Sequence, residues 1–412
     1  MPDWAAWPFP TENPYPAYHA ARERAPVQWD ARLQAHLVLS HEHALTVLRS
    51  PDQWSSDPRK SPELLASYGD ASAIAGLLSN SMLMSDPPAH TRLRAAVGRF
   101  FTPRAMERIR ARVVAIVETA FEPLAEGEPV ELMSELAYPI PLAVIAELFD
   151  VGLEGAQLLR SQTPTLARIL ELDPSPEEIE ALGAAAMNIV LFLIPIIAQR
   201  RVCPGEDLLS ALIHPSDGGV ALHTDEIVTM CLLLLVGGHE TTANLIGNGT
   251  LALLEHPDQL QWLGRHPDRC SQAVEELLRY DSPAQVVSRV ALEDLELGAV
   301  KVRKGQPALV VLGAANRDPA CHPDPDRLDL TRVGMRHLAL GNGLHFCVGA
   351  GLARLQAQET FARLARLQLH PNRYQWSYSR ERSRTLRRLA SLRITEGQLD
   401  HPPTPLSALQ SA

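Results

Sequence analysis

Hydrophobic residues recur with a period near 3.6 over most of the chain between residues 105 and 275, which is the period of helices with one buried face. Strand-like alternation is confined to four short stretches, at residues 26–30, 35–40, 297–302 and 308–312. The first two of these predict a hairpin. The pattern therefore predicts a mainly α chain with a small β portion. No glycine- and serine-rich or charged linker divides the sequence, so we expect residues 1–412 to form a single domain.

Capping residues mark the starts of three expected helices. Ser40 precedes a short helical pattern, and Thr102 followed by Pro103 precedes the long helical region. Thr224 precedes a long apolar pattern that begins with Asp225 and a glutamate. Hydroxyl side chains satisfy free N–H groups at a helix start, and acidic residues favour the positive end of the helix dipole. We therefore expect helices to begin directly after these three residues.

The segment from Ala181 to Ala198 holds 18 residues without a charge, which is long enough to cross a membrane. Asn188 and Pro195 interrupt it, and three glutamates lie just before it. A single span in the middle of the chain would also place the two halves on opposite sides of a membrane. We therefore expect a helix whose broad apolar face lies inside the fold, and no membrane partner.

Composition narrows the possible functions. Lys and Arg number 38 against 48 Asp and Glu, and the net charge of −10 argues against nucleic acid as a partner, which requires a basic face. The five cysteines are odd in number, widely spaced and without a C-x-x-C pair, which disfavours disulfides and a structural zinc site. The first residues show no signal-peptide pattern. These features predict a cytoplasmic protein.

A glycine-rich loop, Leu-Gly-Asn-Gly-Leu-His-Phe-Cys-Val-Gly-Ala over residues 340–350, leads into an amphipathic helical pattern. Its cysteine, Cys347, would lie at the helix N-terminus, where the dipole and free N–H groups stabilise a thiolate. Its glycines, among them Gly341, lack Cβ atoms and let the backbone approach a flat, bulky group. This combination suits a thiolate bound to haem iron. From the loop alone, the alternative is a structural free cysteine.

The long apolar helix expected after residue 224 carries Gly237, Gly238, Glu240 and Thr241 near its middle. Two glycines inside a helix cost about 1 kcal/mol each relative to alanine, and a buried glutamate needs a partner or a raised pKa. The Thr241 hydroxyl can turn back to the Gly237 carbonyl and open the helix locally. Such a helix leaves room for a small ligand and a route for protons. The alternative is a kinked core helix.

Two other strings begin like known motifs but are incomplete. His239-Glu240 starts like the zinc-protease motif H-E-x-x-H, but Ala243 stands where the second histidine is needed. Gly341-x-Gly343 starts like a dinucleotide-binding fingerprint, but Phe346 stands where the third glycine is needed. Neither chemistry is expected.

Two further pairs lie at helical spacing. His90 and Arg94 are four residues apart, and Glu276 and Arg279 are three apart, so the members of each pair share one helix face. Taken alone, the first pair is typical of an exposed polar face and the second of a surface ion pair that contributes little.

Taken together, these strings resemble the cytochrome P450 family in order and spacing over nearly the whole chain. The loop that contains Cys347 is similar to the family's haem-binding loop, with Leu340 in place of the usual aromatic residue and Gly351 where proline is frequent. The string at 237–241 resembles the family's oxygen-activation helix. The resemblance implies the cytochrome P450 fold, in which haem lies between a long kinked central helix and the cysteine loop with its following helix.

The resemblance also implies roles for individual residues. Cys347 would bind the iron of haem b as a thiolate, and Glu240 and Thr241 would deliver protons for cleavage of the O–O bond. The side chains facing the haem propionates would be His90, Arg94, Arg289 and His345, with Gly341 in the haem-binding loop. A structural network that holds this loop in place would join Glu276, Arg279 and Arg327.

The implied activity is that of a soluble bacterial-type monooxygenase, which inserts one atom of O2 into a small organic substrate, in natural-product biosynthesis. Its electrons would come from a separate ferredoxin and an NAD(P)H-dependent ferredoxin reductase, docked through Arg104, Arg336 and Arg354. Alternatives are a fatty-acid or terpenoid hydroxylase, a peroxide-driven or coupling haem-thiolate enzyme, and a non-catalytic haem sensor. The acid–alcohol pair of Glu240 and Thr241 disfavours the peroxide-driven enzyme and the sensor.

Substrate contacts implied by the resemblance come from the loop near 60–85, from the apolar helix at 181–198, and from Leu234, Val236, Gly237, Val286, Val287 and Leu389. Most of these residues are apolar, so a largely hydrophobic substrate is expected. Arg388 and Arg393 stand where glycine and proline are frequent in the family. We expect Arg388 to be a surface arginine. The alternative is a contact to a substrate carboxylate or phosphate.

Overall fold

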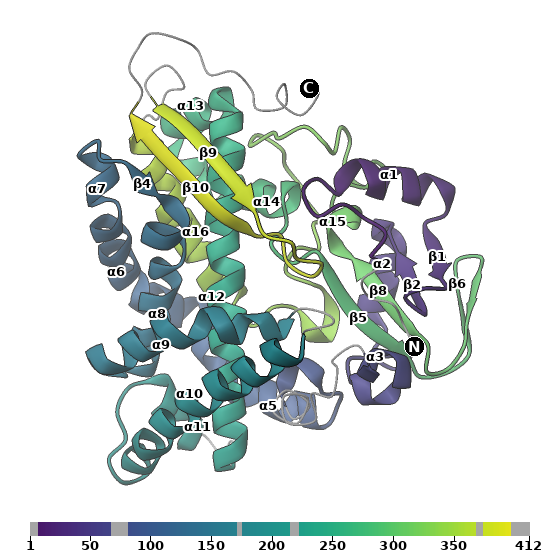
Figure 1. Cartoon of the computed structure of the whole chain (residues 1–412), viewed down its shortest axis with the longest axis horizontal. Coiled ribbons are helices and arrows are strands. Elements are labelled where there is room, and N and C mark those ends of the chain that lie inside the picture. Colours follow the sequence, from purple (N-terminus) through teal and green to yellow (C-terminus); the bar gives the residue numbers. More distant parts are fainter. Residues whose placement is uncertain (1–6, 67–80, 171–174, 215–221, 368–373, 397–412) are drawn as a thin grey trace.

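The structure, a computed structural model, describes residues 7–66, 81–170, 175–214, 222–367 and 374–396. A helical body and a smaller β-rich part lie side by side (Figure 1). The body is built around α12 (Thr224–Glu255), and the largest sheet lies close to α1 (Tyr15–Arg24) and α2 (His41–Arg49). This arrangement confirms the predicted mainly α chain with a small β portion.

The other helices occupy the rest of the body and the connections to the sheet. Their bounds, in chain order, are α3 (Pro62–Ala66), α5 (Ala89–Gly98), α6 (Pro103–Ala120), α7 (Glu122–Ala125), α8 (Pro139–Phe149), α9 (Gly152–Leu166), α10 (Pro176–Val202), α11 (Leu208–Ile213), α13 (Pro257–Arg265), α14 (Cys270–Tyr280), α15 (Leu312–Ala315) and α16 (Ala350–Arg366).

The largest sheet has the strand order β1-β2-β8-β5-β3. Its strands are β1 (Val27–Asp30), β2 (Ala35–Val38), β3 (Trp54–Ser55), β5 (Val286–Ala291) and β8 (Pro307–Val311). β1 and β2 form the predicted hairpin, with Val27 opposite Val38. β8 lies in the middle of the sheet and is buried along its whole length. A central strand covered on both faces is apolar throughout, which explains the uninterrupted Pro-Ala-Leu-Val-Val sequence.

A second sheet has the order β4-β10-β9 and joins β4 (Val130–Glu131), β9 (Tyr374–Arg380) and β10 (Leu389–Glu396). The single strand predicted at 297–302 is wrong. It is instead part of a small hairpin of β6 (Leu295–Leu297) and β7 (Val300–Val302), because Gly298 turns the chain with a φ of 61°. A positive φ is easily adopted by glycine and ends the strand there.

Two of the three predicted caps are confirmed and one is wrong. The Ser40 hydroxyl accepts a hydrogen bond from the His43 N–H at 3.4 Å, and the Thr102 hydroxyl accepts one from Ala105 at 3.3 Å. At α12 the residue with extended backbone is His223, not Thr224. The carboxylate of Glu226 accepts the His223 N–H at 2.9 Å, so this glutamate satisfies the helix start in place of the threonine hydroxyl.

The uncharged segment at 181–198 forms most of α10, but its predicted placement inside the fold is only partly correct. One face, with Ile189 and Leu193, is fully buried and packs against α9 and α12. The other face exposes Met187, Leu191 and Ile194, with Leu191 62% exposed. By length and composition this is the one helix among the described residues that is apolar enough to cross a membrane.

Glu276 and Arg279 on α14 form an ion pair in which neither side chain is exposed, so the surface interpretation of this pair is wrong. The Arg279 guanidinium donates to Glu276 at 2.7 and 2.8 Å. It also donates to the backbone carbonyls of Asn316, Pro325 and Arg327, at 3.1, 2.7 and 3.2 Å. One buried side chain therefore fixes three points of the loop that follows α15.

The third side chain in this network is Arg332, and not Arg327 as the sequence predicts. Arg332 Nε lies 3.4 Å from Glu276, whereas the Arg327 side chain is exposed and this residue contributes only its carbonyl. The turn after Pro325 carries Arg327 outward, and the next arginine returns to the carboxylate. The loop after α15 holds several arginines, and the sequence does not show which of them reaches Glu276.

A second buried carboxylate, Asp281, was not identified from the sequence. It accepts hydrogen bonds from the Tyr15 hydroxyl at 2.5 Å, from Arg387 at 3.0 Å and from Arg380 at 3.2 Å. The Arg317 guanidinium lies 3.9 Å from the centre of the Tyr15 ring. Asp281 thus joins the N-terminal helix, the end of α14 and the C-terminal strands.

Replacing Arg332 by glutamine should lower the free energy of unfolding, because Glu276 would lose one of its two counter-charges. Removing the whole partner, in Arg279→Met, should cost about 3–5 kcal/mol, as expected when one member of a buried ion pair is lost. Urea unfolding of the haem-loaded protein measures both effects. Arg327→Gln is the matched control and should unfold like the unchanged protein. Equal losses for Arg332→Gln and Arg327→Gln would contradict the network described here.

Candidate active site

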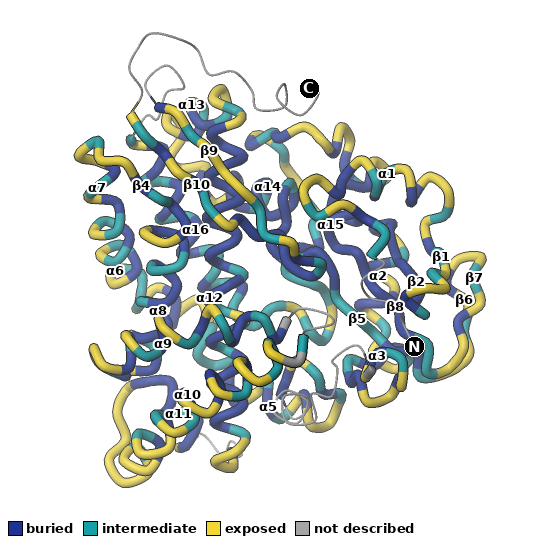
Figure 2. The backbone as a smooth tube through the Cα atoms, viewed as in Figure 1, coloured by how far each residue is buried: buried dark blue, intermediate teal, exposed yellow. Residues whose placement is uncertain are grey.

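The middle of α12 has an open stripe on a helix that is otherwise buried (Figure 2). Leu234, Gly237, Gly238 and Thr241 are partly or fully exposed, whereas the residues between them are buried. Their spacing of three, one and three residues places them on one helix face. A Cβ added to Gly237 would meet no atom within 4 Å. An open space therefore lies against this stripe in the middle of the molecule.

Thr241 makes the hydrogen bond predicted from the sequence. Its hydroxyl donates to the Gly237 carbonyl at 2.5 Å, and α12 continues as one helix through this point. A threonine hydroxyl bonded to the carbonyl four residues earlier remains able to accept a second hydrogen bond. Thr241 thus presents an oxygen acceptor beside the open stripe.

Glu240, the neighbour of Thr241, is buried at 2% exposure and is ion-paired with Arg388. Arg388 Nε lies 3.3 Å from the Glu240 carboxylate, and Asn244 donates to the same oxygen at 3.4 Å. Arg388 is itself only 4% exposed, so its interpretation as a surface arginine is wrong. It belongs to the segment that enters β10 and brings the charge that a buried carboxylate requires.

Arg388 has further partners that fix its position. Its Nη2 donates to the Ala167 carbonyl at 3.3 Å, and its Nη1 lies 3.5 Å from the Glu381 carboxylate. The only indication in the sequence that Arg388 has a special role was that it stands where glycine is frequent in the family. The partner itself, Glu240, lies almost 150 residues earlier in the chain and could not be identified from spacing.

The loop that contains Cys347 holds the sulfur against the start of α16. The Cys347 N–H donates to the Leu340 carbonyl at 2.9 Å, which closes the loop. Burial raises the pKa of the Cys347 thiol, while a hydrogen bond from the Gly349 N–H and the charges of Arg94 and Arg354 oppose this increase. One backbone donor at the helix start, the Gly349 N–H, therefore faces the sulfur and, with the two arginines, favours the thiolate that a metal ion would bind, although burial outweighs these groups.

The glycines of this loop were predicted to let the backbone approach a bound group, but in the structure one of them is required for contact with another part of the protein. Gly341 and Gly343 have φ values of 70° and 67°, a conformation that disfavours other residues. A Cβ on Gly343 would lie 2.2 Å from the carbonyl oxygen of Leu48, at the end of α2. Gly343 is therefore required for packing of the loop on α2, whatever the loop binds.

The four residues predicted to face propionates include a cluster of basic side chains, and the nearby carboxylate of Asp86 is bonded to Lys60 at 2.7 Å. The rings of His90 and His345 lie 4.3 Å apart. Burial, together with Arg289 and His90, lowers the pKa of His345 to about 3, and burial and the nearby Arg94 lower the pKa of His90. Mutual depression of these pKa values shows that the groups share one small volume.

Two further observations indicate that this cluster faces an anion. His90 is fully buried, and neither of its ring nitrogens has a hydrogen-bond partner within the described residues. Burial lowers the pKa of Arg289 to about 10, and its hydrogen bond is to the carbonyl of the neighbouring Ser288 at 2.7 Å. Buried donors are nearly always satisfied, so carboxylate groups of a ligand fit this cluster well.

These features together fit a haem. The sulfur of Cys347 would bind the iron, the open stripe of α12 leaves space for a flat group and a substrate, and the basic cluster of His90, Arg289 and His345 would bind the two propionates. Each feature rests on a different part of the chain.

The predicted substrate contacts divide into two groups. Val236, Val286 and Leu389 are buried among core residues, and Leu389 packs against Gly247 of α12. Leu234, Gly237 and Val287 retain exposed surface and remain available to a ligand. Of the predicted loop at 60–85, residues 67–80 lie outside the described part of the chain.

The arginines predicted to dock an electron donor differ in availability. Arg104 and Arg336 are exposed. Arg354 is instead engaged by Glu275, at 2.6 and 2.8 Å. Although burial opposes it, the hydrogen bonds from Arg354 and His337 lower the pKa of Glu275 to about 2. Arg354 is thus part of the packing between α14 and α16.

Comparison with known proteins connects this geometry to one family. The sequence profile described as Cytochrome P450 matches residues 270–377. Cytochrome P450 107B1 of Saccharopolyspora erythraea is 40% identical, over 84% of this chain and 86% of its own length. The 6-deoxyerythronolide B hydroxylase of the same organism is 39% identical, over 84% and 86%. The crystal structure of P450BioI in complex with an acyl carrier protein ligated to hexadec-9Z-enoic acid has a TM-score of 0.86, with 31% identity, covering 94% of this chain and 99% of that one.

Replacing Gly343 by alanine should destabilise the cysteine loop, because the new Cβ would overlap the Leu48 carbonyl. We expect a lower melting temperature and faster loss of haem. Gly334→Ala is the matched control, since Gly334 has a φ of 68° with no atom within 4 Å of an added Cβ. The control isolates the cost of a left-handed backbone, about 1–2 kcal/mol. If both variants behave alike, the contact with α2 does not require Gly343.

Replacing Arg388 by glutamine should cost about 3–5 kcal/mol of stability, because the buried Glu240 carboxylate would lose its counter-charge. The double variant Arg388→Gln/Glu240→Gln should recover a large part of this loss. Thermal unfolding of the single and double variants forms a double-mutant cycle. Arg393→Gln, at an exposed position of β10, is the control and should be neutral. Additive effects of the two substitutions would show that the ion pair contributes nothing.

Proposed function

The chain belongs to the cytochrome P450 family and is a haem-thiolate monooxygenase, and from this premise we propose the roles of its residues and the class of its substrate. When bound, haem activates O2 with two electrons, so that one oxygen atom enters the substrate and the other leaves as water. The observation that carries the assignment of this site is the coincidence of three features. They are the Cys347 sulfur under the Gly349 N–H, the unsatisfied basic cluster around His90, and the open stripe on α12.

We propose that the cofactor is haem b, bound through Cys347. His90, Arg94, Arg289 and His345 would bind its propionates. Binding of two carboxylates would supply partners for the buried ring nitrogens of His90 and a counter-charge for the half-buried guanidinium of Arg289. The glycine at 341 would keep the loop clear of the haem face.

Thr241 and Glu240 are proposed to handle protons at the open stripe. The Thr241 hydroxyl donates to Gly237 in this structure, so it can accept a hydrogen bond from a ligand or water in the open space and pass a proton on by rotating. Glu240 is adjacent in sequence but buried against Arg388.

The substrate is proposed to be a largely hydrophobic natural product, oxidised during its biosynthesis. Leu234, Gly237 and Val287 would contact it, and these residues offer apolar surface and backbone and no charge. The related hydroxylase named for 6-deoxyerythronolide B supports this class. The likeness to P450BioI, which was crystallised with an acyl carrier protein, makes a carrier-bound fatty acyl chain the second candidate.

Electrons are proposed to come from a ferredoxin and its NAD(P)H-dependent reductase in the cytoplasm. Phe346, directly before the ligand, is 36% exposed, so the surface over the thiolate is open to a partner. Arg104 and Arg336 would contribute positive charge to docking. Arg354, held by Glu275, would not.

The ferrous–CO difference spectrum of the purified protein tests the ligand assignment. We expect the strongly red-shifted Soret band of a haem-thiolate protein, and its loss in Cys347→Ser. Cys270→Ser serves as the control, because Cys270 is a buried free cysteine outside the ligand loop and its replacement should leave the band in place. A band at the wavelength of ordinary histidine-ligated haem proteins would contradict thiolate ligation, and failure to bind haem would contradict the whole assignment.

A further inference from the structure

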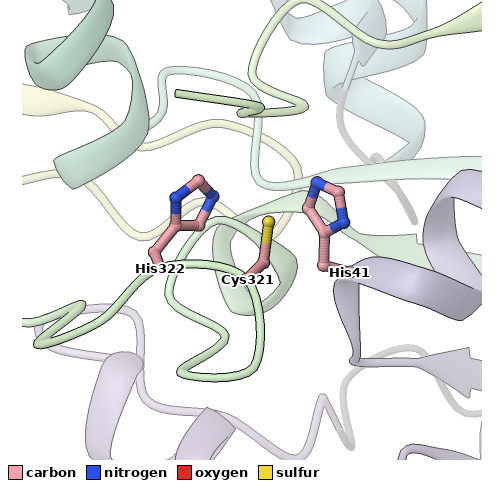
Figure 3. A group of neighbouring side chains, drawn as sticks. All are labelled: His41, Cys321 and His322. Carbon is pink, nitrogen blue, oxygen red and sulfur yellow. The ribbon is translucent and has the colours of Figure 1, made fainter. Parts of the chain in front are cut away.

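Three potential metal ligands that are far apart in the sequence meet between the start of α2 and the loop after α15. His41, Cys321 and His322 each direct one ligand atom toward the others, and these atoms all lie within 4.8 Å of one another. Figure 3 shows the sulfur of Cys321 between the two imidazole rings. The sequence disfavoured a zinc site because it lacks a C-x-x-C pair, but here the third ligand comes from a segment 280 residues earlier.

The backbone around these side chains is held in place by one residue, Asp318. Its carboxylate accepts the His41 N–H at 2.9 Å. Its carbonyl accepts the N–H groups of Cys321 and His322, at 3.1 and 2.9 Å. Asp318 is buried at 5% exposure. Its hydrogen bonds to the backbone of all three residues hold the potential ligands in place, as residues around a metal site commonly do.

One of the two histidines has a free lone pair in this structure. His41 turns its Nε2 side toward the other two ligands (Figure 3), and this nitrogen lies 2.6 Å from the Arg336 carbonyl, so binding of a metal ion would replace that hydrogen bond. His322 is 3% exposed, and its Nε2 has no hydrogen-bond partner in the described residues. A buried ring nitrogen without a partner is rare. This orphaned nitrogen is the observation, independent of the cysteine, that indicates a missing ligand.

The positive charges around the site do not exclude a cation, because they are paired with carboxylates. Arg279, Arg332 and His337 all act on His322, but Arg279 and Arg332 are paired with Glu276 and His337 with Glu275. Cys321 is half-buried, which gives a metal ion a route from solvent. Binding of a metal ion would displace the thiol proton of Cys321.

We propose that His41, Cys321 and His322 form a zinc site, with solvent as the fourth ligand. One sulfur and two imidazoles suit a borderline-soft, tetrahedral ion. Zinc bonds of about 2.0–2.3 Å place ligand atoms roughly 3.3–3.6 Å apart, so the side chains need to close by at most roughly 1.5 Å. The ion would fasten α2 to the loop after α15. Since Leu48 of α2 also contacts Gly343, it would stabilise the packing beneath the cysteine loop.

The test is the zinc content of the haem-loaded protein. The protein is stripped with EDTA, incubated with ZnSO4, passed through a desalting column and analysed by mass spectrometry of the metal. We expect about one zinc per chain, a melting temperature a few degrees higher than that of the stripped protein, and loss of both effects in Cys321→Ser and in His322→Phe. Cys203→Ser, which removes an exposed free cysteine, is the matched control and should retain both.

Two results would overturn the proposal. One is zinc retention by Cys321→Ser equal to that of the unchanged protein, and the other is a loss in Cys203→Ser as large as in Cys321→Ser, which would indicate surface thiol binding. The ferrous–CO band verifies that each variant is folded. X-ray absorption at the zinc edge of the unchanged protein provides a measurement that needs no variant: one sulfur and two imidazole nitrogens support the site, and a shell of oxygen and nitrogen alone contradicts it.

Discussion

The position of Cys347 depends on a buried ion pair that does not touch it. Arg279, neutralised by Glu276, donates to the Asn316 carbonyl at 3.1 Å, and the Asn316 side chain accepts the Leu338 N–H at 2.6 Å. Leu338 in turn accepts the Gly341 N–H at 2.8 Å, at the start of the cysteine loop. An unbroken series of hydrogen bonds thus leads from the pair to the ligand loop. Because a charge without its partner is very costly to bury, this pair gives the loop one stable position.

α12 is a buried helix that nevertheless has one open face. Most of its faces are packed by apolar neighbours, and one stripe is kept clear by Gly237, where a Cβ would have no contact. Burying the Glu240 carboxylate beside this stripe costs free energy, and the ion pair with Arg388, which lies outside the helix, offsets this cost. The open stripe and its proton-handling groups therefore depend on a segment near the C-terminus as much as on the helix itself.

Features that depend on near neighbours in the chain could be predicted from the sequence. The hairpin at 27–38, the Ser40 cap and the bond from Thr241 to Gly237 all join residues close in sequence. Most of the errors concern distant partners. Tertiary packing, which leaves no periodic signal in the sequence, decides three of these points. It determines which loop arginine reaches Glu276, which residue neutralises Glu240 and which side chains surround His41. The start of α12 is a local exception: the helix begins one residue earlier than expected, and Glu226, three residues into it, accepts the N–H of His223.

Ion pairing inside the protein distinguishes arginines with a structural role from arginines that are available to bind a ligand. Arg279, Arg387 and Arg388 are buried, and each lies within hydrogen-bonding or ion-pairing distance of a carboxylate. Arg289 instead donates to the carbonyl of the neighbouring Ser288, and the nearby Asp86 is already bonded to Lys60 at 2.7 Å. A fold that neutralises its other buried arginines has no structural reason to leave this one without a carboxylate. The missing negative charge is best supplied by the ligand, and the same reasoning applies to the unsatisfied nitrogens of His90 beside it.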